Sequence, residues 1–322
     1  MFVLNEGSYF YGVNGSLSYI DYCSNTLTNG LFALSNNRTL GGTPNDMALS
    51  DGMLVICCTD ENRVEVVNAT TFRSLQSFEV KKPRCVCIVG QGFYVSSLEG
   101  TVTYFSFDGK QRVESSNLGG NLEGIAYFDG YIYVCNAYNS DYTYNTNVIK
   151  LSTSTLQKNG DIIVACNPTE LKVGDGKLFV KSTGNYVDVN SQIQTIDKSG
   201  KVTYICDATL FDIVGNEIVA VELFSDWTTG ATRSEYFRIT AGGDRKPLLD
   251  ATAAAQIYSP CCIAADALTN MIFVSSYKKN AAGFADYAGK GEIFQFGADG
   301  DFVRRYDAGV GPCTMVRNVK IY

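Results

Sequence analysis

Short apolar stretches recur along the chain. Some are continuous and in others apolar and polar residues alternate, as in β-strands, without the period of a helix. In a typical one, Met53-Leu54-Val55-Ile56 follows the turn pair Asp51-Gly52. Gln91-Gly92, Asp129-Gly130 and Asp175-Gly176 are further pairs of this kind, which favour the positive φ angles of tight hairpins. Arg63-Val64-Glu65-Val66 then alternates with the two-residue period of a half-buried strand. The pattern predicts an all-β chain of antiparallel strands joined by hairpins.

The same unit recurs seven times. Each copy has a proline or leucine marker with an aliphatic residue three positions further on, and successive markers are 39 to 52 residues apart. The markers are Pro44, Pro83, Leu122, Pro168, Leu210, Pro260 and Pro312, and the aliphatic residues are Met47, Val86, Ile125, Leu171, Ile213, Ile263 and Met315. Four-stranded units of this length, repeated without helical periodicity, are typical of propeller blades.

These observations predict a single domain over residues 1–322, a seven-bladed β-propeller with four antiparallel strands in each blade. The chain opens on a second strand, Phe2-Val3-Leu4, and closes on a first strand, Cys313-Thr314-Met315-Val316. The N-terminal and C-terminal strands are therefore expected to share one blade. Such a closure would join the two ends of the chain in one sheet and remove an exposed edge.

The connections after the second strands are expected to emerge on one face of the propeller, and five of them are long: residues 6–15, 137–147, 182–191, 223–234 and 277–291. They collect the aromatic residues Tyr9, Phe10, Tyr11, Tyr138, Tyr142, Tyr144, Tyr186, Phe224, Trp227, Tyr277, Phe284 and Tyr287. Tyrosine and tryptophan suit recognition surfaces because they join a broad apolar ring to one polar group. The alternative is that these rings only pack the loops onto the blades. The aromatic candidates for ligand binding are Tyr9, Tyr11, Tyr142, Tyr186, Trp227, Tyr277 and Phe284.

Polar residues follow the repeat marker in most units, where a propeller has the mouth of its channel. The candidates for ligand binding among them are Asp46, Arg84, Glu123 and Glu170. Such groups could orient a ligand or simply hold channel water, and the sequence leaves both interpretations open.

The composition excludes several kinds of chemistry. Histidine is absent, which rules out Ser-His-Asp, Cys-His and histidine-metal mechanisms. A carboxylate pair such as Glu170 and Asp212 remains a minority enzymatic interpretation, and we expect a protein that is not an enzyme. No cofactor or metal is expected, although the oxygen-rich residues 139–141 and 145–147 leave calcium open. The formal charge of −7 disfavours nucleic acid as a partner.

Eleven cysteines are scattered along the chain instead of clustering at metal-ligand spacings. Cys57-Cys58, Cys85-x-Cys87 and Cys261-Cys262 fall in expected strands, where cysteine serves as a small, readily buried apolar residue. An odd number leaves at least one thiol free. No apolar run is long enough to span a bilayer and no signal peptide is evident. Because the second residue already belongs to a strand, an export signal or a lipid-anchor segment could precede it.

Three stretches resemble a known family: Phe2-Val3-Leu4-Asn5-Glu6-Gly7, residues 15–21 and residues 62–72. They are similar to the YncE-like propellers exported by Bacteroidetes, some of which are surface lipoproteins that capture cobalamin. The resemblance covers nearly the whole chain as a blade pattern, with its closest motifs in the first two blades. It implies a lipid-anchored protein of the cell surface or periplasm, with a TonB-dependent outer-membrane transporter as partner.

Two functions follow from the residues and the resemblance. The first is a non-catalytic binding protein that captures a nutrient such as a corrinoid on the loop-rich face and passes it to the transporter. The second is a protein-interaction scaffold that uses the same face and binds no small molecule.

Overall fold

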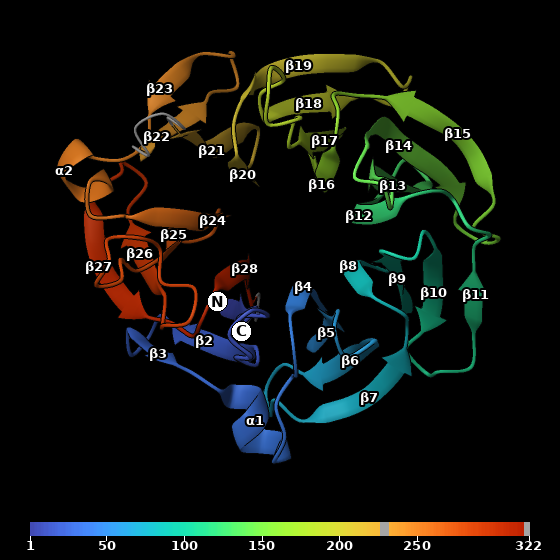
Figure 1. The fold of residues 1–322 in the computed structure, drawn as a ribbon, viewed down its shortest axis with the longest axis horizontal. Coiled ribbons are helices and arrows are strands. Elements are labelled where there is room, and N and C mark those ends of the chain that lie inside the picture. Colours follow the sequence, from blue (N-terminus) through green and yellow to red (C-terminus); the bar gives the residue numbers. More distant parts are fainter. Residues whose placement is uncertain (226–231, 319–322) are drawn as a thin grey trace. The chain divides into compact units, whose positions relative to one another are not determined.

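The computed structural model describes residues 1–225 and 232–318. The chain forms seven four-stranded antiparallel sheets, which are the blades of a seven-bladed β-propeller (Figure 1). This confirms the fold that the repeat predicts. In six of the blades, strands that follow one another in the chain are hydrogen-bonded neighbours, so each of these blades is a simple meander, whereas the remaining blade pairs the last strand of the chain with the first. No helix among the described residues is long and apolar enough to cross a bilayer.

The contacts within the chain divide it into two compact units. Unit 1 comprises residues 1–45, 67–75 and 209–322, and unit 2 comprises residues 46–66 and 76–208. Both units are built from the same four-stranded element.

Unit 1 contains three complete blades. Their strands are β28 (Pro312–Val316), β1 (Phe2–Asn5), β2 (Ser16–Asp21) and β3 (Thr26–Thr28); β20 (Leu210–Val214), β21 (Glu217–Ser225), β22 (Thr232–Ile239) and β23 (Arg245–Pro247); and β24 (Ser259–Asp266), β25 (Met271–Tyr277), β26 (Glu292–Phe296) and β27 (Phe302–Asp307). Strand β28 pairs with β1, with Val3 opposite Met315 and Leu4 opposite Thr314. The two ends of the chain therefore share a blade, as the sequence predicts.

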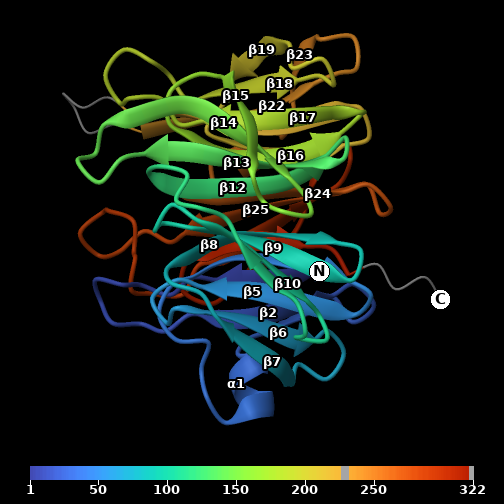
Figure 2. The same cartoon turned by 90° about the vertical axis from the view of Figure 1, so that its right-hand side faces the viewer.

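Unit 2 also contains three complete blades, whose strands run side by side in Figure 2. Their strands are β8 (Pro83–Val89), β9 (Gly92–Ser97), β10 (Val102–Ser106) and β11 (Arg112–Glu114); β12 (Asn121–Phe128), β13 (Tyr131–Tyr138), β14 (Tyr144–Ser152) and β15 (Lys158–Ile163); and β16 (Pro168–Gly174), β17 (Lys177–Ser182), β18 (Gln192–Ile196) and β19 (Val202–Asp207). The seventh blade consists of β4 (Pro44–Ser50), β5 (Met53–Cys58), β6 (Arg63–Asn68) and β7 (Ser74–Glu79).

The hairpin turns mostly form where the turn pairs predict them. Asp51 and Gly52 take positive φ angles of 47° and 75°, and Asp129 and Asp175 begin equivalent turns. The pair Gln91-Gly92 is an exception. Here the positive φ angle of 56° belongs to Gly90, and Gly92 is already the first residue of β9, paired with Ser106 of β10. The turn therefore lies one residue earlier than expected.

Two short helices interrupt the strand pattern, and neither was expected from the sequence. Helix α1 (Leu31–Asn36) connects β3 to β4 and buries Leu31 and Phe32. Helix α2 (Ala251–Ala254) begins after Asp250, whose carboxylate accepts hydrogen bonds from the backbone N–H groups of Thr252 and Ala253. Helices of six and four residues are too short to produce a periodic apolar pattern, which explains why the sequence does not predict them.

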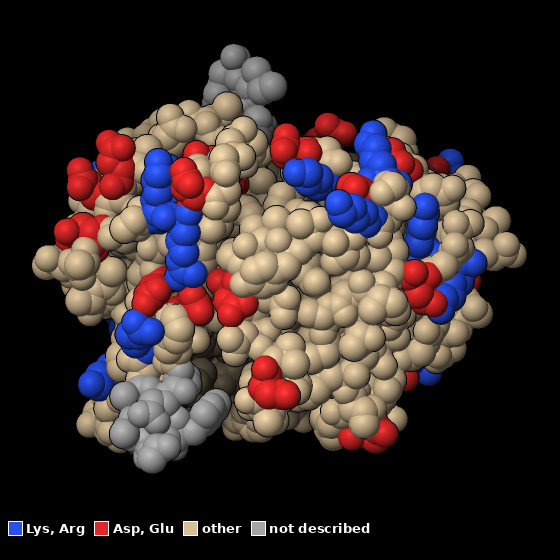
Figure 3. Space-filling view, turned by 90° about the horizontal axis from the view of Figure 1, so that it is seen from above, with Lys and Arg blue, Asp and Glu red and all other residues tan. Residues whose placement is uncertain are grey.

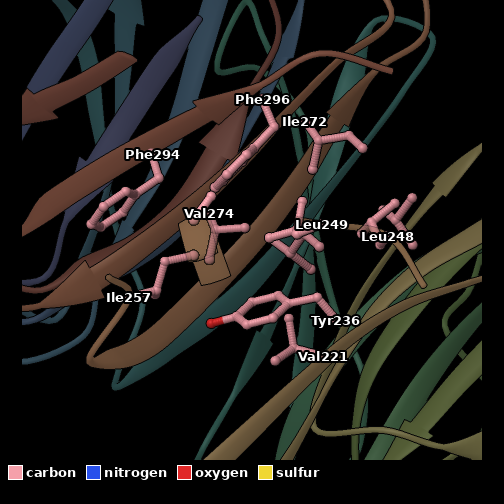
Figure 4. Packing of buried hydrophobic residues seen from close by; sticks show 12 residues of the cluster. Val221, Tyr236, Leu248, Leu249, Ile257, Ile272, Val274, Phe294 and Phe296 are labelled. Carbon is pink, nitrogen blue, oxygen red and sulfur yellow. The ribbon is translucent and has the colours of Figure 1, made fainter. Parts of the chain in front are cut away.

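Apolar side chains fill the space between successive blades. In unit 1, one cluster joins strands β21 and β22 to β25 and β26 (Figure 4), with Val274, Phe294 and Phe296 completely buried. In unit 2, Val134 of β13 and Ile149 of β14 are equally covered. Complete burial of such a side chain stabilises the folded state by about 1.5–3 kcal/mol. This packing holds the blades in place and leaves the loops available for recognition.

Candidate functional site

An aromatic cavity of about 420 Å³ lies in unit 1, between the loop after β1 and the end of β25. Its walls are Glu6, Gly7, Ser8, Tyr9, Phe10, Tyr11, Thr43, Tyr277 and Tyr287. Three of the predicted ligand-binding residues, Tyr9, Tyr11 and Tyr277, therefore meet at one site.

Backbone hydrogen bonds fix the loop that carries three of these rings. The N–H groups of Glu6 and Gly7 donate to the carbonyl oxygens of Gly311 and Val310, at 2.8 and 2.9 Å. An antiparallel bridge between Ser8 and Val13 then closes the loop. Gly7 has a φ angle of 77°, and a β-carbon there would collide with the carbonyl of Val13, so glycine is required at this position.

The rings at the mouth of this cavity remain open to solvent. Tyr9, Phe10 and Tyr11 expose 72%, 92% and 65% of their surface, respectively. The rings of Tyr9 and Phe10 contact each other edge to face, with centroids 5.6 Å apart. Exposed rings held in a fixed arrangement present apolar area at little cost in side-chain entropy.

The inner wall of the cavity is more polar. The hydroxyl of Tyr277 donates a 2.7 Å hydrogen bond to the carboxylate of Glu6. Burial and the nearby Glu6 charge raise the pKa of Tyr277 far above its ordinary value, so this hydroxyl stays protonated. The ring of Tyr287 lies edge to face with that of Tyr277 at 4.8 Å. Glu6 and Tyr287 are not among the ligand-binding residues predicted from the sequence, although both lie in long loops. Only the fold brings these two loops together.

Phe284 belongs to the same connection as Tyr287 but does not line the cavity. It exposes 70% of its surface, and its N–H donates to the side-chain oxygen of Asn280. Trp227, another predicted candidate, lies outside the described residues.

Unit 2 brings together another set of predicted residues. The guanidinium of Arg84, on β8, forms a 2.6 Å ion pair with Glu123, which is buried on β12. Tyr138 lies close enough for these charges to act on its pKa, which burial and Glu123 raise. The ring of Tyr142 stacks on Tyr138, with centroids 6.3 Å apart and planes 7° from parallel. Tyr138 and Tyr142 also line a cavity of about 580 Å³.

The remaining acidic candidates, Asp46 and Glu170, have hydrogen-bond or ion-pair partners within unit 2. Burial raises the pKa of Asp46 to about 6, and its carboxylate accepts a 3.0 Å hydrogen bond from the N–H of Val86 on β8. Burial also acts to raise the pKa of Glu170, but Lys181 and Lys172 outweigh it and lower that pKa to about 2. Both lysines form ion pairs with Glu170, at 2.9 and 3.2 Å. These contacts tie the first strands of the blades to their neighbours.

The aromatic residues that were expected in the loops of unit 2 do not all lie in loops. Strands β13 and β14 extend further than expected, so Tyr138 and Tyr144 are strand residues. Tyr186 stays in its loop, with a positive φ angle of 60°, and its ring lies 6.2 Å from that of Tyr144. The predicted residues thus form several groups, with Tyr9, Tyr11 and Tyr277 in unit 1 and Arg84, Glu123 and Tyr142 in unit 2.

The three cysteine pairs lie in strands, as the pattern predicts. Cys57 and Cys58 are buried in β5, whereas the pairs in β8 and β24 are only partly buried, and all eleven thiols are free. Burial raises the pKa of Cys57 and Cys313 well above the ordinary value. Among the described residues, no group of three or more Cys, Asp or Glu side chains is placed to hold a metal ion.

Residues 1–208 match the protein family described as "Domain of unknown function (DUF5074)". No curated protein matches the chain. Several solved structures share its fold. Hydrazine synthase from Kuenenia stuttgartiensis has a TM-score of 0.66 at 16% identity, over 84% of this chain and 88% of that one.

Two more structures extend this likeness over almost the whole chain. A quinoprotein alcohol dehydrogenase-like protein from Bacteroides thetaiotaomicron has a TM-score of 0.64 at 13% identity, covering 96% of this chain and 75% of that one. Apo AztD from Citrobacter koseri has a TM-score of 0.60 at 9% identity, covering 97% and 95%. At such identities the likeness establishes the propeller fold alone.

Proposed function

Because the chain belongs to the DUF5074 family, whose description leaves its function open, we propose a function from the site itself. The protein is a non-catalytic binding protein that captures a partly planar nutrient, such as a corrinoid, in the aromatic cavity of unit 1. The observation that carries this proposal is the meeting of Tyr9, Tyr11 and Tyr277 around one cavity.

The size and chemistry of the cavity support a small-molecule ligand. Its volume of about 420 Å³ lies within the ordinary range for ligand pockets. Aromatic walls contribute apolar contact area, while the Glu6 carboxylate and the Tyr277 hydroxyl offer polar groups that can orient a bound molecule. A ligand larger than the cavity would rest its remaining surface on the exposed rings of Tyr9 and Phe10.

Export and delivery are the second half of the proposal. The first two blades resemble YncE-like propellers of Bacteroidetes, and this resemblance supports a lipid-anchored protein at the cell surface or in the periplasm. A TonB-dependent outer-membrane transporter would then receive the ligand. The exposed rings around the cavity provide apolar area for such a partner to cover.

A visible-absorbance pull-down tests the ligand. Immobilised protein is incubated with cyanocobalamin or with cobinamide, and bound corrinoid is measured after washing. Saturable retention by the wild type and loss of retention in the Tyr9→Ala, Tyr11→Ala double variant would support the proposal. Tyr204→Ala, which alters an exposed ring in unit 2, is the matched control and should retain the ligand. Absence of retention with both corrinoids would exclude this ligand class.

One observation favours the second function, a protein-interaction scaffold. Phe10 exposes 92% of its surface, more than a small ligand in the cavity could cover, and an apolar ring so exposed suits a protein partner. Crosslinking in native membranes without added ligand separates the two functions. A scaffold would capture the same partner with and without corrinoid, and Phe10→Ser would abolish the capture.

A further inference from the structure

A second cavity in unit 1, of about 980 Å³, lies beside α2 and belongs to none of the sites above. Strands β22 and β23 form one wall, α2 and residues 255–258 form another, and the third consists of Lys278 and Lys279, just after β25, with Glu292 at the start of β26. The aromatic cavity has no wall residue in common with it.

The inner part of this cavity is apolar. Tyr236, Leu249 and Ile257 belong both to its lining and to the buried cluster of Figure 4. Short side chains, including Ala254 and Ala255, come from α2 and the residue after it. An apolar group that enters this part of the cavity exchanges water for side-chain contacts, which favours binding.

The hydroxyl of Tyr236 is buried without a hydrogen-bond partner at bonding distance among the described residues. Figure 4 shows the ring beneath Leu249, with its hydroxyl end directed toward Ile257. Burial raises the pKa of this phenol, and the nearby Ser234 side chain opposes that rise only in part. A buried hydroxyl without a partner destabilises the folded state, and a ligand oxygen that reached it would remove this penalty.

Five cationic side chains and two carboxylates surround the cavity, so its lining has an excess of positive charge in a chain whose formal charge is −7. Three of the cations are paired. Arg233 and Arg245 bind Glu235 at 2.6 and 3.0 Å, and Lys278 binds Asp307 at 2.6 Å. On the face shown in Figure 3, basic and acidic side chains are interspersed.

Lys246 and Lys279 differ from these three. Within the described parts of the chain, neither has a carboxylate at ion-pair distance, and the ammonium of Lys279 lies 5.3 Å from the centre of the Tyr258 ring. Both lysines are exposed, and an ammonium without a carboxylate partner favours a bound anion. The cavity therefore combines apolar surface at its floor with unpaired positive charge at its rim.

We infer that this cavity binds an amphipathic organic anion, with the apolar body against Leu249 and Ile257 and the anionic group beside Lys246 and Lys279. A neutral apolar molecule would gain only the first set of contacts, and a small inorganic anion only the second. The site is distinct from the proposed corrinoid cavity, so each can fail without the other.

Two fluorescent probes test both halves of the inference. Anilinonaphthalene sulfonate is an amphipathic anion, and phenylnaphthylamine has the same ring system without the sulfonate. Titrated at low ionic strength into the folded protein, the anion should bind at least about tenfold more tightly than its neutral analogue. Equal affinities of the wild type for the two probes would overturn the inference.

Substitutions then test where the anionic probe binds. Lys246→Met together with Lys279→Met should weaken binding of the anion about tenfold and change binding of the neutral probe less than about twofold. Lys110→Met and Lys198→Met, both on exposed lysines of unit 2, form the matched control and should change neither. Unchanged anion affinity in the first double variant would contradict the site.

Tyr236→Phe supplies an independent readout. Removal of an unpartnered hydroxyl should raise the melting temperature of the free protein, whereas loss of a ligand contact should lower the affinity for the anionic probe. A variant that binds the anion as tightly as the wild type would show that the hydroxyl makes no contact with it, and would overturn the placement of the ligand over Tyr236.

Discussion

The hydroxyl of Tyr277, at the end of β25, donates a 2.7 Å hydrogen bond to the carboxylate of Glu6, which lies 271 positions away in the loop after β1. This contact fixes the inner wall of the aromatic cavity, because it ties the loop that carries Tyr9 and Tyr11 to the blade that carries Tyr277 and Tyr287.

Tyr277→Phe should lower the free energy of unfolding by about 1–2 kcal/mol, because the partly buried Glu6 carboxylate loses a donor. Urea denaturation at neutral pH measures the change. Tyr204→Phe is the control, since the Tyr204 hydroxyl bonds Asp207 at 3.0 Å on an exposed surface. That variant should lose less than about 1 kcal/mol. Equal losses in the two variants would show that the Glu6 contact is no more important than a surface one.

Arg84→Met should destabilise the protein by about 3 kcal/mol, because it leaves Glu123 buried without its cation. The double variant Arg84→Met, Glu123→Met should recover most of this loss, since an apolar pair has no charge to desolvate. Thermal denaturation of the variants gives both values.

The exposed ion pair between Arg112 and Glu114, with a separation of 2.7 Å, is the comparison for this prediction. Arg112→Met should lower the free energy of unfolding by less than about 1 kcal/mol. A loss in Arg84→Met as small as this would mean that Glu123 is solvated in the folded protein, contrary to its observed burial.

The raised pKa of Asp46 predicts that the free energy of unfolding depends on pH. Its pKa is raised from an ordinary value of 3.8 to about 6, so the folded state binds more protons than the unfolded state between these values. Its contribution to stability is therefore fully present below about pH 4 and declines as the pH rises to about 6, by about 3 kcal/mol in all. Asp46→Asn keeps an oxygen for the N–H of Val86 and removes the titration.

The measurement is the free energy of unfolding of wild type and Asp46→Asn at several pH values. Other carboxylates titrate in both proteins, so the difference between the two isolates Asp46. The variant should gain stability relative to the wild type as the pH rises from about 4 to about 6.5, and the difference should stay constant above that. A difference that does not change with pH would contradict a raised pKa at this residue.

The sequence was sufficient for the fold because the repeat is local. Markers such as Pro83 and turn pairs such as Asp51-Gly52 define each blade within about 40–50 residues, and the phase of the first and last strands identifies the shared blade. Helix α2 was missed because it is a single turn, which Asp250 caps.

The candidate site could be predicted only in part. Loop length and aromatic content identified Tyr9, Tyr11 and Tyr277, but nothing local connects them to Glu6, whose bond to Tyr277 depends on the fold. The acidic candidates were identified, but their contacts were not. The sequence predicts polar groups at Asp46 and Glu170, but it does not show which groups on neighbouring strands these carboxylates bind.

Isothermal titration of the aromatic cavity with cobinamide is the most direct test of the central claim. The account predicts saturable binding to the wild type and affinity at least about tenfold weaker in the Tyr9→Ala, Tyr11→Ala variant, with Tyr204→Ala unchanged. Two results would contradict it. One is the same heat of binding in all three proteins, and the other is no heat of binding when the wild type is titrated with cobinamide or with cobalamin.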